Sequence, residues 1–173
     1  ILSEAMEELG VETGISTRSG AEKYVDDCTI ETDKPTYIPD DYIDVMAEKI
    51  RVYKVLDAQT QEREIDRLAA QVTDRFGTMP EEVDNLFKVV KIRNLGTTTG
   101  FDKIIIKNGM LIMFFVNNPL SGYYQSKQFE KVLSQVNDNP TLFEFNQDGG
   151  KLRTVSRGVD SLGKALEILK KLQ

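Results

Sequence analysis

Histidine is absent from this chain of 173 residues, and Cys28 is its only cysteine. The chain therefore lacks the side chain that proteins use most often as a general base and as a metal ligand. A single cysteine forms no internal disulfide, and without histidine it builds no zinc site. We expect a reduced, cytoplasmic setting, and we expect these residues to hold no metal and no cofactor.

Long apolar runs and nucleotide-binding motifs are also missing. The longest apolar run, Met110 to Val116, has the length of a strand and falls far short of the ~20 residues that cross a bilayer. No glycine-rich loop ends in Gly-Lys-Ser or Gly-Lys-Thr, and no Gly-x-Ser-x-Gly motif occurs. We expect no membrane partner, and a small hydrolase is disfavoured because no base and nucleophile can be assembled.

Positive charge is scarce: 22 basic residues face 28 acidic ones, for a net charge of -6. An acidic chain repels the phosphate backbone, which disfavours independent DNA binding. The segment 151–173 is the exception, with six bases and two acids. It leaves open the alternative of an accessory nucleic-acid-binding domain. No aromatic residues interleave with these bases as a stacking platform, however, and Lys170-Lys171 suits the last turn of a helix.

Paired carboxylates are the remaining candidates for chemistry. Asp40-Asp41 with Asp44 could bind a hard cation through oxygen atoms. Capping of a helix that starts beside them is the simpler interpretation. Asp26-Asp27 is interpreted as solvated charge, and no base or helix terminus is identifiable beside Cys28 that would make it a reactive thiol.

Apolar residues at spacings of three and four predict three helices before residue 100. The first, capped by Asp40 or Asp41, has as its apolar positions Ile43, Met46, Ala47, Ile50 and Tyr53. The second is capped by Thr60 and ends at Gly77, which is expected in a left-handed conformation. Its inward positions are Ile65, Leu68, Ala69, Val72 and Phe76. The third starts near Pro80, ends before Gly100 and buries Val83, Leu86, Phe87 and Val90.

A period of two then predicts strands. Phe101 to Lys107 and Met110 to Val116 flank Asn108-Gly109, a strong hairpin signal. Both faces of the second strand are apolar, so we expect it to be central and covered on both sides. A helix follows that ends by Asn139-Pro140 and buries Phe129, Val132, Leu133 and Val136.

A second hairpin, Thr141 to Asn146 and Lys151 to Arg157, turns at Asp148-Gly149-Gly150. The last helix is expected to be capped by Asp160. The order is three helices followed by ββαββα. It predicts an α+β fold with a roughly four-stranded antiparallel sheet packed against helices.

The first 34 residues differ in composition from the rest. The chain opens at Ile1 inside a predicted helix, Leu2 to Leu9, without an initiator methionine or a signal peptide. Residues 10–34 are rich in glycine, threonine, serine and acids, which predicts a linker with one short extended piece. We therefore expect a piece of a longer polypeptide, with an upstream tail and linker over 1–34 and one domain over 35–173.

Several segments together resemble the C-terminal domain of bacterial transcription-repair coupling factors. Ile38-Pro39-Asp40-Asp41-Tyr42-Ile43 looks like the Leu-Pro-Asp-Asp-aromatic-Ile entry of that domain. Three further segments are similar to sequence marks of that domain. They are Tyr53-Lys54, Asp74-Arg75-Phe76-Gly77 followed by Pro80, and Ile92-Arg93 before Gly100. The match covers about residues 36–100 well and 101–173 by pattern. The stretch Leu2 to Leu9 looks like the closing helix of the upstream translocase module.

This resemblance implies a parent protein that is an ATP-dependent DNA translocase. In that family the parent dislodges stalled RNA polymerase, recruits the excision-repair protein UvrA and acts on double-stranded DNA. Its motor, with ATP and magnesium, lies upstream of this segment. The C-terminal domain packs on an N-terminal UvrB-like module, hides the UvrA-binding surface and restrains the motor. The resemblance therefore implies a regulatory domain without catalysis of its own.

The family makes this contact with the polar face around the Asp-Arg-Phe-Gly helix end. At 100° per residue, the outward side of that helix carries Gln71 and Asp74, with Arg67 on the same side and Arg75 at its edge. These four residues are the candidate interdomain binding site. The family often has an acid where Gln71 stands, which weakens a charge-pair argument at that position.

Overall fold

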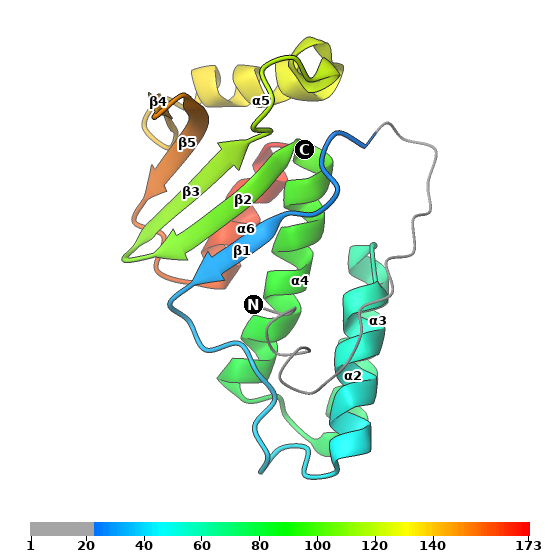
Figure 1. Ribbon diagram of the computed structural model, residues 1–173. Helices are drawn as coiled ribbons and strands as arrows, with labels where there is room; N and C mark the ends of the chain where they lie inside the picture. The colour runs from blue at the N-terminus through cyan, green and yellow to red at the C-terminus, as the bar shows by residue number, and fades with distance from the viewer. Residues whose placement is uncertain (1–22) are drawn as a thin grey trace. The chain divides into compact units, whose positions relative to one another are not determined.

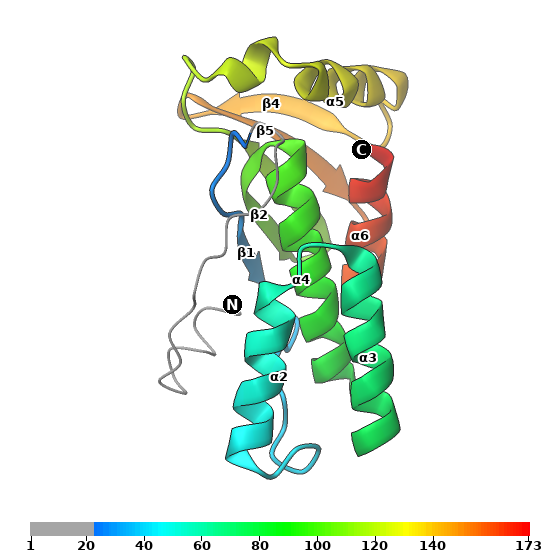
Figure 2. The ribbon, with the colours of Figure 1, turned by 90° about the vertical axis from the view of Figure 1, so that its right-hand side faces the viewer.

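A computed structural model describes residues 23–173 of the chain. The described part forms two compact units (Figures 1 and 2). Unit 1 comprises Lys34–Lys91. Unit 2 comprises the described residues up to Asp33 together with Ile92–Gln173. Unit 1 is thus inserted in sequence between two segments of unit 2, a division that no sequence pattern predicted.

Unit 1 is helical. It contains α2 (Met46–Ala58), α3 (Glu62–Phe76) and the first part of α4 (Glu81–Thr99). Its core consists of fully buried apolar side chains: Ile38, Ile43, Val52, Tyr53, Leu56, Ile65, Leu68, Val72, Val83, Leu86, Phe87 and Val90. The predicted inward positions of the second and third helices are confirmed, with Ala69 and Phe76 partly buried. Gly77 has the expected positive φ, 92°, but its ψ of -173° is not left-handed helical.

The start of the first helix was predicted too early. Residues 39–43 form a turn in which the N–H groups of Tyr42 and Ile43 donate to the Pro39 carbonyl. The N-cap is Val45, in an extended conformation without a side-chain cap. Because the helix begins later, Met46 and Ala47 are exposed and the buried positions become Lys49, Val52, Tyr53 and Leu56.

Asp40 therefore acts as an ion-pair partner rather than a cap. Its carboxylate binds the ammonium of Lys49, whose side chain is 8% exposed. Burial of a lysine is costly unless the charge is paired, so this contact explains why Lys49 is tolerated on the buried side of α2.

Two other predicted caps were one residue away from the observed ones. The N-cap of α3 is Gln61, not Thr60. The final helix, α6 (Leu162–Lys171), is capped by Ser161, whose hydroxyl accepts a hydrogen bond from the Lys164 N–H at 3.1 Å, and not by Asp160. Serine and aspartate cap equally well, so adjacent candidates are not separated by sequence.

Unit 2 is built on a five-stranded mixed sheet in the order β1-β2-β3-β5-β4. The strands are β1 (Thr29–Thr32), β2 (Phe101–Lys107), β3 (Met110–Phe115), β4 (Glu144–Asp148) and β5 (Lys151–Arg157). The first hairpin is confirmed, with φ of 54° at Asn108 and 72° at Gly109. The second hairpin is also present, although its first strand starts three residues later than predicted.

The predicted four antiparallel strands are confirmed, but the sheet has a fifth. Strand β1 comes from the segment interpreted as a linker and pairs with β2 in parallel. Only Ile30 of its four residues is buried, so the strand is too short to show a period of two. The predicted division of the parent protein at residue 35 remains a prediction.

Helices cover one face of the sheet. Figures 1 and 2 show α6 and the second part of α4 against it, while α5 (Lys127–Asp138) lies at one end with the short 3-10 helix Gly122–Gln125. At Gly96 of α4 an added Cβ would come within 2.7 Å of the Cys28 sulfur and 2.8 Å of an Ile104 methyl. Glycine therefore permits the close approach of this helix to the sheet.

The expectation that β3 is covered on both sides was wrong. Its position in the sheet is central, as predicted, and Leu111, Met113 and Phe115 are buried beneath the helices. Met110, Ile112 and Phe114 point to the other face and are only partly buried. No helix in residues 23–173 is long and apolar enough to cross a membrane.

Candidate docking face on α2 and α3

The four predicted site residues lie on the outward side of α3. Arg67, Gln71, Asp74 and Arg75 are all exposed, whereas Ile65, Leu68 and Val72 on the opposite side are buried. The helical period of 3.6 separates the two sets, since residues three or four apart share a side. The polar side is thus available to another surface without any change to the core of unit 1.

Arg75 is held by the neighbouring helix. Its guanidinium lies 2.8 Å from the carboxylate of Glu48 on α2, and Arg51 lies 3.3 Å from the same carboxylate. Partial burial tends to raise the pKa of Glu48, but hydrogen bonds and charge from Arg51 and Arg75 outweigh it and lower that pKa. This ion-pair cluster fixes one corner of the face.

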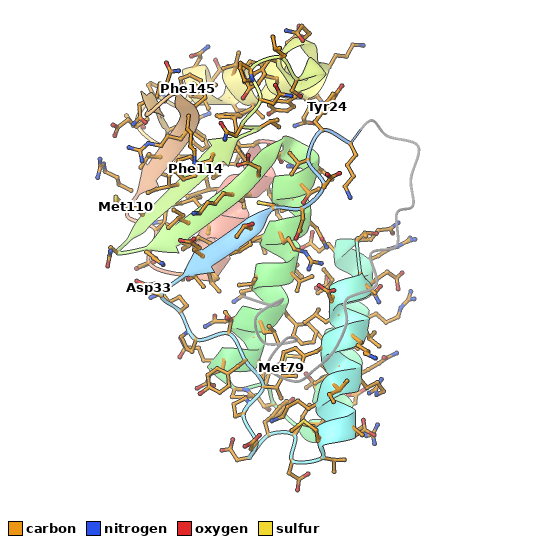
Figure 3. All side chains as sticks on the ribbon, in the orientation of Figure 1. Tyr24, Asp33, Met79, Met110, Phe114 and Phe145 are labelled. Carbon is orange, nitrogen blue, oxygen red and sulfur yellow. The ribbon has the colours of Figure 1, made fainter. Side chains whose placement is uncertain are left out.

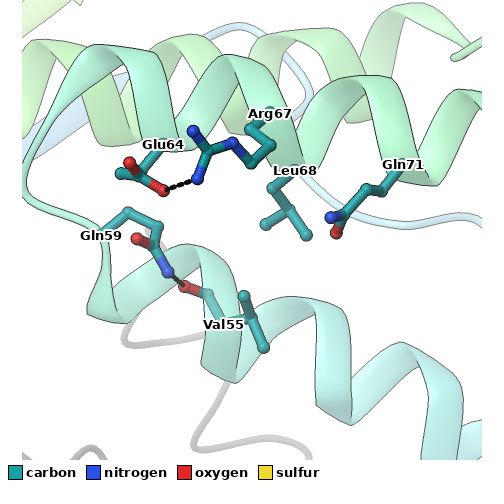
Figure 4. Close-up of a pocket in the computed structure, with 6 residues that line it drawn as sticks. All are labelled: Val55, Gln59, Glu64, Arg67, Leu68 and Gln71. Atoms are coloured by element: carbon teal, nitrogen blue, oxygen red, sulfur yellow. Dashed lines mark hydrogen bonds and ion pairs between the residues drawn. The ribbon is translucent and has the colours of Figure 1, made fainter.

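Arg67 and Gln71 line a shallow open pocket between α2 and α3 (Figure 4). Val55, Gln59, Glu64 and Leu68 complete its lining. Arg67 is paired with Glu64 at 3.1 Å, and Gln59 donates to the Val55 carbonyl at 2.8 Å. The lining therefore combines four polar side chains with two apolar ones, Val55 and Leu68, and Asp74 and Arg75 are not part of it.

Gln71 and Asp74 differ from the two arginines. Within residues 23–173, neither side chain forms a hydrogen bond or ion pair, and both are exposed. They lie three positions apart on one helix, so their side chains are neighbours on the surface. A partner could engage both without breaking an existing contact.

The two segments that carry the family resemblance are brought together in unit 1. The Tyr42 hydroxyl donates to the Gly77 carbonyl at 2.7 Å, and the rings of Tyr42 and Phe76 lie 6.1 Å apart. The Tyr53 hydroxyl accepts a hydrogen bond from the Ile38 N–H at 2.9 Å. The first two contacts tie the turn at residues 38–43 to the end of α3, and the third ties it to α2, so the motif residues help to position the face.

Sequence reasoning missed the contribution of α2 to this face. Glu48, Val55 and Gln59 were not predicted as part of it, because the prediction considered the outward side of α3 alone. The sequence does contain one signal for the buried side of α2, since Val52, Tyr53 and Leu56 follow one another at helical spacing and are all buried. The packing of α2 on α3 could not be predicted, because the period of each helix shows which residues share a side but not how two helices align.

Other titratable groups offer no alternative site in the described residues. Burial raises the pKa of the Cys28 thiol, and the charges of Asp27 and Asp102 add to this. The thiol is thereby kept protonated, in the form that does not attack. No group of three or more histidine, cysteine, aspartate or glutamate side chains in residues 23–173 could hold a metal ion.

Glu48→Gln tests the ion-pair cluster. A carboxylate whose folded pKa lies below its unfolded value stabilises the fold above the unfolded value, about 4.3, and this contribution is lost as pH falls through the folded pKa. The free energy of unfolding should therefore fall less steeply on acidification in the variant than in the unmodified chain.

Urea unfolding between pH 6 and pH 3 measures this difference. Glu167→Gln is the matched control and should keep the slope of the unmodified chain, because Glu167 is an exposed residue of α6 that forms no ion pair within residues 23–173. Identical slopes for Glu48→Gln and the unmodified chain would show that the cluster contributes nothing.

Comparison with known proteins identifies the family. The model of the TRCF domain matches residues 32–126, more than half of the chain. The transcription-repair-coupling factor of Haemophilus influenzae is 27% identical over 142 residues, which is 73% of this chain and 12% of the relative. The corresponding factor of Escherichia coli is 24% identical over 157 residues, or 87% of this chain and 14% of the relative.

A solved structure shares the fold. The crystal structure of a C-terminal domain of transcription-repair coupling factor aligns with a TM-score of 0.70 at 16% identity, covering 84% of this chain and 89% of that one. This chain spans less than a sixth of the length of the two curated relatives described above. The matched region 32–126 includes every residue of the candidate face.

Proposed function

Because the chain belongs to the TRCF domain family, we propose that it is the regulatory domain of a transcription-repair coupling factor. It acts by docking its α2–α3 face on the N-terminal UvrB-like module of the same polypeptide. Docking hides the surface that recruits UvrA and restrains the ATP-dependent motor until RNA polymerase is engaged. The domain itself contributes no chemistry to translocation on double-stranded DNA.

One observation carries this proposal: Gln71 and Asp74 are exposed and form no side-chain hydrogen bond or ion pair in residues 23–173, and Gln71 lines the pocket between α2 and α3. A reversible contact needs side chains that can form new bonds without dismantling the fold, and these two meet that condition. The paired arginines Arg67 and Arg75 sit on either side of them and are held in place by Glu64 and Glu48. A preorganised rim of this kind reduces the entropy lost on docking.

The energy required is small. A lid that is closed 99% of the time needs only about 2.7 kcal/mol in favour of the closed state. Interfaces between domains of one chain bury roughly 600–1,500 Å², which is sufficient for this. Tethering raises the effective concentration, so the separated domain should bind its target weakly in trans.

Asp74→Arg in the full-length parent is the direct test. Reversing the one carboxylate of the face that has no partner in the described residues should open the lid and raise the apparent affinity for UvrA by about tenfold or more, in proportion to the open fraction. A pull-down or a titration of UvrA measures the change. Unfolding by urea should show little loss of stability, because the Asp74 side chain is exposed and forms no hydrogen bond or ion pair within the described part of the fold.

Glu167→Arg is the matched control, since it reverses an exposed charge on α6 and lies outside the face. It should bind UvrA like the unmodified parent. A folded Asp74→Arg parent that binds UvrA no better than the control would refute the assignment of this face. A pull-down between this chain and the N-terminal half of the parent tests the docking partner.

The accessory nucleic-acid-binding role is the competing proposal. Its support is the basic segment Lys151, Arg153 and Arg157, which forms strand β5 with three cations on one side. Tight binding of duplex DNA by this chain at low salt, with a steep loss at higher salt, would favour it over the docking role.

A further inference from the structure

Strand β4 is the last strand in the order of the sheet of unit 2, where it pairs with β5. Its five residues, Glu144–Asp148, follow β5 in a register without a shift. In an antiparallel ladder, alternate backbone groups of an edge strand point away from the sheet. Within residues 23–173, no hydrogen bond to the outward N–H and C=O groups of Glu144–Gln147 is formed. This edge can therefore accept a further strand.

The edge of β4 lacks several features by which proteins usually prevent such pairing. Those features include lysine or proline on the strand and a bulge that twists the edge away. Strand β4 contains neither lysine nor proline, and its register with β5 shows no bulge. The carboxylate of Glu144 lies 3.4 Å from the Arg157 guanidinium on β5, so its charge is partly offset within the sheet.

Phe145 places apolar surface at this edge (Figure 3). It pairs with Thr154 of β5, which pairs in turn with Met113 of β3, so the three side chains form one row on the face that helices cover. Thr154 and Met113 are fully buried, whereas Phe145 is 41% exposed although its ring lies 5.8 Å from that of Phe115. The buried row is therefore incomplete at the edge, and a strand beyond β4 would complete it.

The sequence of β4 is complementary to itself in one antiparallel register. With Phe145 opposite its own copy, Glu144 would face Asn146 of the second copy, and Phe143 would face Gln147. This register opposes no like charges and brings the two Phe145 rings together on the helix-covered face. Aromatic pairs across strands stabilise a sheet, and like charges directly opposite destabilise it. A register centred on Asn146 would oppose Phe145 to Gln147 and lose the aromatic pair.

We propose that β4 pairs with β4 of a second copy of this chain, antiparallel and centred on Phe145, so that two five-stranded sheets become continuous. Each copy contributes the same strand, and the contact uses both β4 edges, so association stops at two copies. One strand from each copy buries little surface, and the dimer should therefore be weak and dependent on concentration. This inference concerns unit 2 and does not depend on the docking of the α2–α3 face.

Cysteine substitution tests the register. Phe145→Cys places two thiols opposite each other, and opposed residues of an antiparallel pair have Cα atoms about 4.5–5.5 Å apart, within the range of a disulfide. Mild oxidation of the 173-residue chain should therefore convert this variant to a covalent dimer, which a non-reducing gel detects. Cys28 is 1% exposed, so the unmodified chain should give no covalent dimer under the same treatment.

Gln147→Cys is the matched control, since Gln147 is exposed on the same strand. In the proposed register its two copies are offset by four residues, about 13 Å, so this variant should cross-link at least about tenfold more slowly. Equal rates at the two positions would indicate random collision and overturn the proposal. The absence of a covalent dimer from Phe145→Cys would overturn it as well.

Sedimentation equilibrium measures the association without a cross-link. The average mass of the unmodified chain should rise with concentration above the mass of one copy. Phe145→Glu opposes two carboxylates across the dimer and should raise the dissociation constant by about tenfold or more. Gln147→Glu adds the same charge opposite Phe143 and should change the constant by no more than about twofold. With both variants folded by circular dichroism, equal weakening, or an unmodified chain that stays single at every concentration, would contradict the β4–β4 pairing.

Discussion

Gly100→Ala should destabilise the chain more than any other single substitution proposed for it. Gly100 joins α4 to β2 with φ of 104°, and an added Cβ would lie 2.1 Å and 2.2 Å from two ring carbons of Tyr123. The ring cannot withdraw, because Tyr123 is fully buried and its hydroxyl donates to the Thr99 carbonyl at 2.6 Å. A clash of this kind with backbone strain should cost more than about 4 kcal/mol, a large share of the 5–15 kcal/mol typical of a domain.

The matched control is Gly109→Ala in the first hairpin. Its φ is 72°, and an added Cβ would have no atom within 4 Å. This variant reports backbone strain alone, which should cost about 1–2 kcal/mol. Urea unfolding followed by circular dichroism at 222 nm measures both variants. A Gly100→Ala chain as stable as Gly109→Ala would show that the Tyr123 ring does not occupy the described position.

Phe115→Ala should have the second largest effect. The ring lies at the centre of an aromatic cluster, with Phe101 at 4.9 Å, Phe129 at 5.7 Å and Phe145 at 5.8 Å between ring centroids. Its side chain is 2% exposed. Removing a phenyl ring from such a site leaves a cavity and should lower the free energy of unfolding by about 3–5 kcal/mol.

Phe114→Ala, one residue earlier on β3, is the comparison. Phe114 points to the face without helices and is partly buried, so its loss should cost clearly less, about 1 kcal/mol. Thermal and urea unfolding of both variants measure the difference. Equal losses would contradict the register of β3, because a shift of one residue exchanges the two faces.

The elements with strong local signals were predictable. The Asn108-Gly109 turn, the inward side of α3 and the extent of α4 follow from short-range rules of turn chemistry and helical period, and the structure confirms them. Helix starts were less predictable. At the first helix, a run of acids offered several capping residues, whereas Val45 is the N-cap that the structure shows.

Long-range features could not be derived from local pattern. Strand β1 has one buried residue, Ile30, and its partner β2 begins some seventy positions later in the sequence. The pairing of Arg75 with Glu48 joins two helices and depends on how they pack. The candidate face was predicted from α3 alone, so its α3 half was available in the sequence and its α2 half was not.

The insertion of unit 1 between β1 and β2 has a kinetic consequence. The parallel β1–β2 pair closes a loop that contains all of residues 33–100, whereas the β2–β3 and β4–β5 hairpins close loops of a few residues. Loop-closure entropy makes distant contacts slow to form, so the hairpins should form early and β1 should join the sheet last. Amide hydrogens of β1 should accordingly be the first in the sheet to exchange with solvent, and tension on the preceding chain should detach this strand before any other.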